Sequence, residues 1–467
     1  MLLKLKNKFN KLIGNKAFYK TTIAIALPIM LQQGITSFVS ILDNLMVGQL
    51  DTISFEAVSI SNQILFIINI ALIGGLAGPG IYLAQFLGAN DEEGMKKSFR
   101  VKLIFALTIL TIGILVYSIF GKYLLGSFFT NDPLANEKVE KGLEYLQYMI
   151  IGLIPMAIVQ LYGTSLREIG HTKIPMYCGV VAIFVNLIGN YILIFGHFGA
   201  PALGVVGAAI ATMISRIVEA LLLVTISHSK KYAFCHRVYK SFEIGKKLFL
   251  QITKKGSFLL LNEVLWSLGM TVLVMAYTYR GEDGVVSAYT ISSTVSNLFY
   301  IIFAAQSAAI SVMVGNELGA NKLESAEKHA YQLLFFATVV AIAFGALLAI
   351  ISPFVPHLYP EASANAKAMA TRFMLIVALF LPLYAYNTGC FFVLRSGGKT
   401  SLTFIFDSGF MWVIAVPAAF LLALFTPLEI TLVYFIVQCF DLIKSIIGTK
   451  MIIGKSWIKN LTITNTN

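Results

Sequence analysis

The chain consists of long apolar runs separated by short polar connectors. Twelve of these runs are long enough to cross a bilayer as a helix, which needs about 20 mostly apolar residues. They lie at about 21–47, 58–88, 102–121, 145–165, 174–196, 203–226, 257–278, 286–315, 331–356, 372–394, 401–424 and 428–449. The pattern therefore predicts an all-α membrane protein with twelve transmembrane helices.

The first run carries a polar stripe along one face. Read at 100° per residue, the polar residues between Met30 and Met46 share one arc of about 140°, and apolar residues fill the rest. Asp43 is the only ionisable residue in this window and lies in the middle of the arc. The stripe predicts a helix that lines a wet cavity. The alternative is an aspartate near the end of a span that reaches the headgroup water.

Composition and charge support a membrane protein and predict its orientation. Apolar residues make up 57% of the 467 residues and the mean hydropathy is +0.80, which exceeds what a soluble domain can bury. Most of the 35 Lys and Arg residues fall at the two ends and in alternate connectors, so both termini are expected in the cytoplasm, beneath the inner or plasma membrane. The net charge of +12 reflects this topology and contact with lipids, and nucleic acid is not an expected partner.

Two sequence motifs recur in order in the second half of the chain. Residues 59–90 resemble residues 290–321 at an offset of 231, and both segments end in Leu-Gly-Ala-Asn. The motif Leu166-Arg167-x-x-Gly170-x-Thr172 recurs at residues 394–400, at an offset of 228. Two parallel six-helix halves are typical of transporters that bind cargo near the membrane midplane. We therefore expect a basic cytoplasmic leader, an N-terminal bundle, a cytoplasmic linker, a C-terminal bundle and a cytoplasmic tail at residues 1–20, 21–227, 228–256, 257–450 and 451–467.

Over about residues 15–450 the sequence resembles the multidrug and toxic compound extrusion (MATE) transporters. The resemblance rests on the two repeated motifs and on three further segments, which are Ala26-Leu27-Pro28, Asp43-Asn44-x-Met46-Val47-Gly48 and Gly204-Val205-x-Gly207-Ala208-Ala209-Ile210-Ala211-Thr212. It implies two six-helix bundles that form a V-shaped cleft, and cation-coupled export by alternating access. The family also places a shape-changing helix at Pro28, although plain helix irregularity is the alternative for this proline.

The acidic residues inside the spans are the candidates for binding a cation. They are Asp43, Glu219, Glu263, Asp407 and Asp441, and within the spans only Arg216 opposes them. A carboxylate in a cavity can take up a proton, or instead hold Na⁺ or an organic cation. Competition for one negative charge is the simplest physical basis for exchange.

In the first half, Asp43 matches the first-span aspartate of the family. Asn186 and Asn190 stand one helical turn apart on the fifth span, where their amides could surround this carboxylate. Some relatives carry an acid in place of Asn190, so a two-acid proton relay is in doubt here, and interhelical amide contacts are the alternative role. Gln160 and Thr212 are expected to complete the cluster.

In the second half, Glu263 matches the seventh-span glutamate of many relatives and corresponds to Gln32 at the repeat offset. Na⁺ is possible at Asp43 or Glu263, although the tenth span lacks the aspartate of several sodium-coupled relatives. Asp407 is expected either to line a cavity or to cap a helix.

Two ion pairs and two loop anchors are also expected. Glu219 and Asp441 each lie three residues from a basic residue, Arg216 and Lys444, and are expected to form ion pairs with them. Arg167 and its repeat equivalent Arg395 are expected to anchor cytoplasmic loops.

The sequence thus predicts a monomeric antiporter, coupled to H⁺ or Na⁺, that exports apolar and often cationic organic compounds and needs no other cofactor. A flippase for lipid-linked oligosaccharides is an alternative, but it would need a cationic cleft for a diphosphate. A membrane transferase is a second alternative, but the chain lacks DDxxD, HxxxxD and HExxH patterns.

Overall fold

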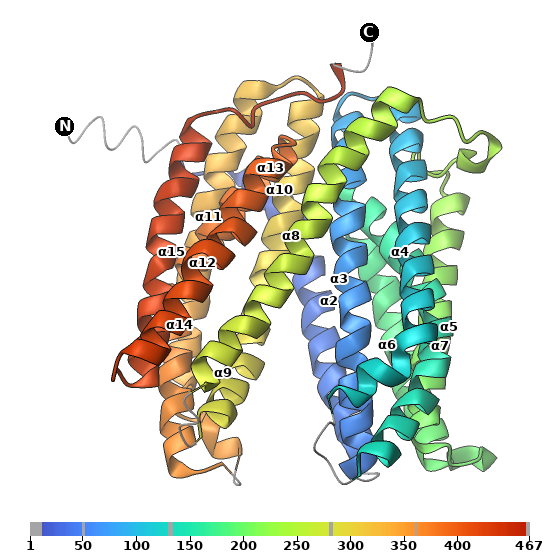
Figure 1. Ribbon diagram of the computed structural model, residues 1–467. Coiled ribbons are helices and arrows are strands. Elements are labelled where there is room, and N and C mark those ends of the chain that lie inside the picture. Colours follow the sequence, from blue (N-terminus) through green and yellow to red (C-terminus); the bar gives the residue numbers. More distant parts are fainter. Residues whose placement is uncertain (1–11, 49–51, 129–133, 280–283, 360–361, 464–467) are drawn as a thin grey trace. The chain divides into compact units, whose positions relative to one another are not determined.

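The computed structural model describes residues 12–48, 52–128, 134–279, 284–359 and 362–463 (Figure 1). Every regular element within these ranges is a helix. Twelve segments are long and apolar enough to cross a membrane, which confirms the predicted all-α fold with twelve spans.

The first six spans are single helices. They are α2 (Lys16–Gly48), α3 (Thr52–Gly88), α4 (Glu92–Gly126), α5 (Ala135–Glu168), α6 (Lys173–Phe195) and α7 (Gly204–Ser229). The short 3₁₀ helix η1 (His197–Gly199) connects α6 to α7, and η2 (Val238–Lys240) follows α7. Helix α8 then begins at Lys246 rather than near residue 257, so part of the basic linker is helical.

The second six spans are less regular. Their helices are α8 (Lys246–Thr278), α9 (Val285–Phe299), α10 (Ile301–Gly319), α11 (Leu323–Ile351), α12 (Ala364–Ser396), α13 (Thr400–Phe404), α14 (Val416–Phe425) and α15 (Ile430–Ile453), with the 3₁₀ helix η3 (Val355–Leu358) after α11. Tyr300 separates α9 from α10 within one span. Two π-helical segments, η4 (Ile405–Gly409) and η5 (Met411–Ala415), lie between α13 and α14. Such π turns are rare in proteins, and those that occur are often found at functional sites. The segment η4 contains Asp407.

The chain forms two compact units. The first unit comprises Met1–Met30, Ala84–Asn90 and Leu261–Asn467, and the second comprises Leu31–Leu83 and Asp91–Leu260. Helix α2 passes from one unit to the other after Met30, and α8 does so after Leu260. These two positions are nearly equivalent in the sequence repeat, so each half of the chain contributes a helix that belongs to both units.

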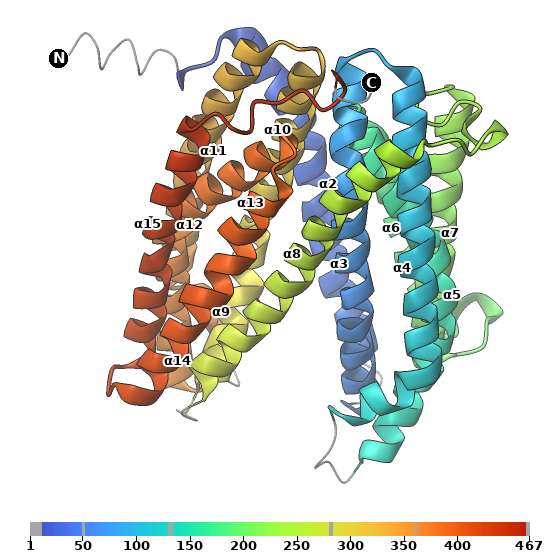
Figure 2. The same cartoon turned by 45° about the horizontal axis from the view of Figure 1, so that its top comes forward.

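In the first unit, α12 packs against α9, α10, α11 and α15, and Figures 1 and 2 both show it next to α11 and α15. Its side chains Phe373, Met374 and Leu381 are fully buried. The repeated Leu-Gly-Ala-Asn motif brings the end of α3 against α10 in this unit. A Cβ atom on Gly88 or Gly319 would clash with the backbone carbonyl oxygen of Asn316 or Gln85, so only glycine permits this approach.

In the second unit, α7 packs against α5 and α6. Gly207 of the Gly-Val-Val-Gly-Ala-Ala motif allows this contact with α6, because a Cβ atom there would lie 2.4 Å from the carbonyl oxygen of Leu193. Gly189 on α6 faces Ala211 on α7 in the same way. These small residues set the register of α6 and α7, and they thereby bring Asn186 and Thr212 within hydrogen-bonding distance.

Candidate functional site

The first candidate site surrounds Asp43 on α2 in the second unit. The Nδ2 atom of Asn190, on α6, donates a hydrogen bond to Asp43 Oδ1 at 2.8 Å. The Asn186 amide is oriented with its nitrogen toward Asp43, because this orientation pairs both of its polar atoms. Its nitrogen then lies 3.0 Å from Asp43 Oδ2, and its oxygen accepts a hydrogen bond from Thr212 Oγ1 at 3.2 Å.

Neutral donors alone hold the Asp43 carboxylate in the described part of the chain. Arg216 on α7 pairs with Glu219 at 2.8 Å, as the sequence predicted. The Oδ1 atom of Asn190 is buried and has no hydrogen-bond partner among the described residues. Arg216 acts on the Asp43 carboxylate only at longer range. The site therefore combines a negative charge that no described residue pairs directly with an unused acceptor oxygen, which suits it to bind a proton or a small cation.

Gln160 is not part of this hydrogen-bonded group in the described structure. Its Nε2 atom donates to Asn69 Oδ1 at 2.9 Å, on the neighbouring helix α3. Asp43, Asn186, Asn190 and Thr212 are thus brought together as expected, whereas Gln160 bonds to Asn69 instead.

The first unit contains the second candidate site, a cavity of about 490 Å³. Its polar lining includes Glu263, Asp407, Asp441 and Lys444. Aromatic side chains form much of the remaining wall, namely Trp266, Tyr277, Tyr289, Tyr300, Phe303, Tyr384, Phe391, Phe392, Phe410 and Tyr434. Its volume falls in the range of pockets that take drug-sized ligands.

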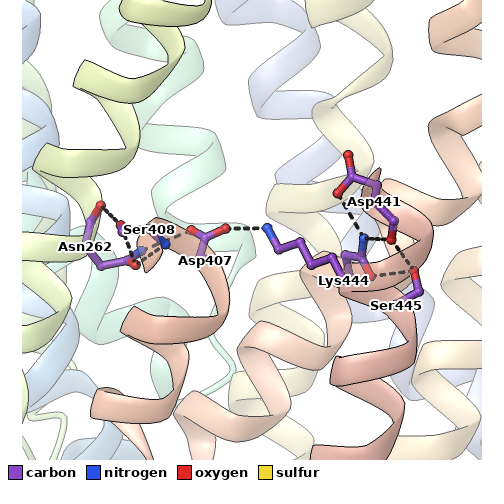
Figure 3. A network of polar contacts seen from close by, with 7 residues as sticks. Asn262, Asp407, Ser408, Asp441, Lys444 and Ser445 are labelled. Carbon is purple, nitrogen blue, oxygen red and sulfur yellow. Dashed lines mark hydrogen bonds and ion pairs between the residues drawn. The ribbon is translucent and has the colours of Figure 1, made fainter. Parts of the chain in front are cut away.

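An ion pair links α15 to the π-helical turn η4 within this cavity (Figure 3). Lys444 Nζ lies 2.7 Å from Asp407 Oδ1, and Asn262 Nδ2 donates to Asp407 Oδ2 at 3.1 Å. The sequence counted Lys444, at the end of the last span, among the cytoplasmic charges, but the structure places it in the cavity wall. A basic partner for Asp407 was missed because it comes from a separate helix.

The expected ion pair between Asp441 and Lys444 is wrong, because Lys444 turns to Asp407 instead. Among the described residues, the Asp441 carboxylate accepts a hydrogen bond from Asn387 Nδ2 at 3.2 Å. Ser445 Oγ in turn donates to Asn387 Oδ1 at 2.7 Å and orients this amide. Asp441 is therefore held by neutral groups, as Asp43 is in the other unit.

The two repeated arginines form equivalent contacts in the two halves. Arg395 Nη1 lies 4.0 Å from Glu263 Oε1, and Arg167 Nη2 donates to Gln32 Oε1 at 3.3 Å. Glu263 and Gln32 match at the repeat offset, so the structure reproduces the sequence repeat as a repeated contact. The prediction that these arginines anchor cytoplasmic loops did not include this contact, which forms because the long side chains extend from the motif to a neighbouring helix.

Comparison with known proteins identifies the family. The MatE family model matches residues 28–192 and 258–421, one segment in each half. The chain belongs to the MATE family of membrane transporters. Members of this family are transporters rather than enzymes, so the transferase alternative is wrong.

The MATE relatives match most of the chain. A probable multidrug resistance protein NorM of Halalkalibacterium halodurans is 24% identical over 88% of this chain and 88% of its own length. The uncharacterized transporter YisQ of Bacillus subtilis is 24% identical over 84% of this chain and 85% of its own length.

Solved structures share the MATE fold. A MATE crystal structure in complex with MaL6 has a TM-score of 0.82 and 21% identity, and covers 95% of this chain and 98% of its own. The outward-facing conformation of a multidrug resistance MATE transporter has a TM-score of 0.82 and 20% identity, over 98% of both chains. The protein is thus a multi-pass membrane protein with the MATE fold.

Proposed function

We propose that this MATE protein is a cation-coupled antiporter in which Asp43 carries the coupling ion. The observation that supports this most strongly is the Asp43 carboxylate, which is hydrogen-bonded by Asn186 and Asn190 without a basic partner among the described residues. Such a carboxylate retains its negative charge only at a cost, and a proton or Na⁺ removes that cost. Thr212 supports the site by orienting the Asn186 amide.

The second candidate for coupling, Glu263, is less suited to this role. Arg395 already faces its carboxylate at 4.0 Å, whereas Asp43 has no described basic side chain within that distance and Arg216 acts on it only at longer range. We therefore assign coupling to Asp43, and we assign Glu263 and Asp407 to the wall of the cargo cavity.

The proposed cargo is an apolar organic molecule that carries a positive charge. The cavity wall contains the carboxylates of Glu263, Asp407 and Asp441 against the single ammonium of Lys444, and its aromatic rings favour cations by their electron-rich faces. Several relatives are named as probable multidrug resistance proteins, which agrees with such a cargo. A flippase for anionic diphosphates would require the opposite charge.

Transport would proceed by alternating access, with ion binding shifting the balance between two states. Pro28 lies inside α2, two residues before the position at which this helix passes from one unit to the other. Since proline removes a backbone hydrogen bond, we propose this segment as the hinge. Both termini are proposed to lie in the cytoplasm, on the side of the basic connectors.

The test is export of ethidium from proteoliposomes under an imposed pH gradient or an imposed Na⁺ gradient. Asp43→Asn should reduce gradient-driven export to the level of empty liposomes, while Glu263→Gln keeps its dependence on the gradient. Glu429→Gln, at an exposed ion pair with Arg372, is a matched control and should export normally. The gradient that drives export identifies the ion.

Undiminished export by Asp43→Asn would refute the assignment of coupling to this residue. Loss of Na⁺-driven export with Glu263→Gln would move coupling to the other unit. If neither gradient moves the dye in the wild type, the antiporter proposal itself is wrong.

A further inference from the structure

The protein supplies its own cation to one carboxylate of the cargo cavity. The Lys444 ammonium is bound by Asp407 at 2.7 Å, and it also lies 5.3 Å and 5.8 Å from the ring centroids of Phe406 and Phe410. A carboxylate with two aromatic faces is the kind of site that recognises an ammonium group. This part of the cavity is therefore a cation site that the chain itself occupies.

A second carboxylate in the same cavity, that of Asp441, has no basic side chain within 4 Å in the described structure, and Lys444 interacts with it only at longer range. In the described structure, Asp441 is bonded to the neutral amide of Asn387. One turn away along the paired helices, Tyr384 donates to Gln438 at 2.7 Å, so α12 and α15 present a tyrosine next to this carboxylate. Glu263, by contrast, has Arg395 at 4.0 Å.

Tyrosine rings surround the cavity on the side of α8, α9 and α12. Tyr277 lies 5.2 Å from Tyr434 between ring centroids, and Tyr300 lies 6.5 Å from Tyr384. Tyr277 is 3% exposed, and its hydroxyl is buried without a hydrogen-bond partner among the described residues. An unpaired buried hydroxyl is costly unless a ligand completes it, so this wall is suited to a bound molecule with a polar group.

From these contacts we infer that Asp441 is the carboxylate that pairs with cationic cargo, and that Lys444 limits the cargo to one positive charge. Lys444 occupies Asp407 and Arg395 faces Glu263, which leaves one carboxylate for the cargo. A second positive charge on the cargo would meet the Lys444 ammonium rather than a free carboxylate, and would be repelled. The inference rests on the proposed export of organic cations. It adds that the cargo carries a single positive charge and that Lys444 sets this limit.

The test compares ethidium and propidium, which share a phenanthridinium ring but carry one and two fixed charges. Binding of each dye to purified full-length protein in nanodiscs is measured by fluorescence at pH 8 without any gradient. We expect wild type to bind ethidium about tenfold more tightly than propidium, and Lys444→Met to shift this ratio toward propidium by about tenfold. Lys450→Met, on the exposed face of the same helix, is the matched control and should leave the ratio unchanged.

Asp441→Asn should weaken ethidium binding by about tenfold or more, since it removes the charge that pairs with the dye. Asp407→Asn should also weaken it, because the released ammonium then turns to Asp441. The double variant Asp407→Asn/Lys444→Met should bind ethidium as wild type does, because Asp441 keeps its charge and no ammonium is released toward it. Its preference for ethidium over propidium should lie between those of wild type and Lys444→Met, because the repelling ammonium and the freed Asp407 carboxylate are both absent. It leaves neither an unpaired ammonium nor an unpaired carboxylate at this pair, so it controls for misfolding.

The inference is overturned if Lys444→Met keeps the wild-type dye ratio, or if Asp441→Asn binds ethidium normally. It is also overturned if wild type binds neither dye. These outcomes concern binding at equilibrium, whereas the proposed antiport is judged by gradient-driven export. A protein that exports ethidium normally in every Lys444 and Asp441 variant would therefore retain its proposed function and lose this inference.

Discussion

Each of the two units contains a partly buried carboxylate, but the two units compensate its charge in opposite ways. Asp43 in the second unit is bonded to the amides of Asn190 and Asn186, which carry no charge. Asp407 in the first unit is bonded to one amide, that of Asn262, and to the ammonium of Lys444. The amides orient Asp43 and leave its charge in place, whereas the ammonium cancels the charge of Asp407.

This difference separates two tasks that an exporter must perform. A carboxylate held only by amides is stabilised when it binds a proton or Na⁺, so its occupancy responds to the concentration of that ion. A carboxylate that is already paired gains little from an external cation, because the internal one must first be displaced. We therefore expect the Asp43 site to report ion concentration, and the Asp407–Lys444 pair to shape the cargo cavity.

The largest effect on stability is expected from breaking the Asp407–Lys444 pair one residue at a time. Lys444→Met leaves the partly buried Asp407 carboxylate without its partner, which should reduce the free energy of unfolding by about 1–3 kcal/mol. Asp407→Asn should cost less within this range, because the released ammonium can turn to Asp441. The side chains are 15% and 19% exposed and line a cavity, so water offsets part of the loss. Thermal unfolding in detergent measures the change.

The double variant Asp407→Asn/Lys444→Met completes a double-mutant cycle that measures how strongly the two charges stabilise each other. It should lose at least about 1 kcal/mol less than the sum of the single variants, because neither charge remains unpaired. Strictly additive losses would mean that the two charges do not stabilise each other. The pair would then contribute packing rather than electrostatic compensation.

Replacing an amide of the Asp43 site by an acid tests the comparison between the two sites more sharply. Asn190→Asp places a second carboxylate within hydrogen-bonding distance of Asp43, where Nδ2 of Asn190 now lies 2.8 Å away. Two adjacent carboxylates cannot both stay ionised, so they share a proton and retain it at higher pH. The pH of half-maximal export should therefore rise by about 1 unit or more.

A pH series of ethidium export by wild type and Asn190→Asp checks this shift. Asn69→Asp is the matched control, since Asn69 accepts from Gln160 and not from the Asp43 group. A profile that stays in place, or moves to lower pH, would contradict H⁺ as the coupling ion at Asp43. Export that no longer depends on pH would contradict it as well.

The sequence predicted the fold and one of the two groupings well, for identifiable reasons. Long apolar runs leave few alternatives to membrane helices, and repeated motifs reveal the two halves. Asn186 and Asn190 lie one turn apart on α6, so helical spacing predicts that they face the same side. The family resemblance then placed Asp43 beside them, and the hydrogen bonds agree with that placement.

The cavity network was not predictable in the same way. Asp441 is the sequence neighbour of Lys444, and helical spacing alone favours that pair. The partner is instead Asp407, from the π-helical turn η4, where the wider turn changes the direction in which side chains point. Local spacing cannot decide between a neighbour on the same helix and a residue on a packed helix, because the outcome depends on tertiary contacts.

The smallest effect is expected where the two halves differ by one functional group. Gln32→Glu would give the second unit the acid–arginine pair that Glu263 and Arg395 form in the first. A charged acceptor for Arg167 strengthens the hydrogen bond, but the Glu219 carboxylate lies nearby: a Cβ atom built on Gly179 would be 2.7 Å from Gln32 Nε2 and 3.5 Å from Glu219 Oε1. The change also removes the hydrogen bond that Gln32 Nε2 donates to the Pro175 carbonyl at 3.3 Å. Attraction to Arg167 should nearly cancel this loss and the repulsion from Glu219, so the free energy of unfolding should change by less than about 1 kcal/mol. The double variant Gln32→Glu/Glu219→Gln removes the repulsion and should be more stable than Glu219→Gln alone. Thermal unfolding of these three variants tests both expectations.

If Gln32→Glu stabilised the protein strongly even with Glu219 present, the positive charge of Arg167 would not be fully balanced by its present neighbours. The second unit would then contain a further charge-dependent position besides Asp43.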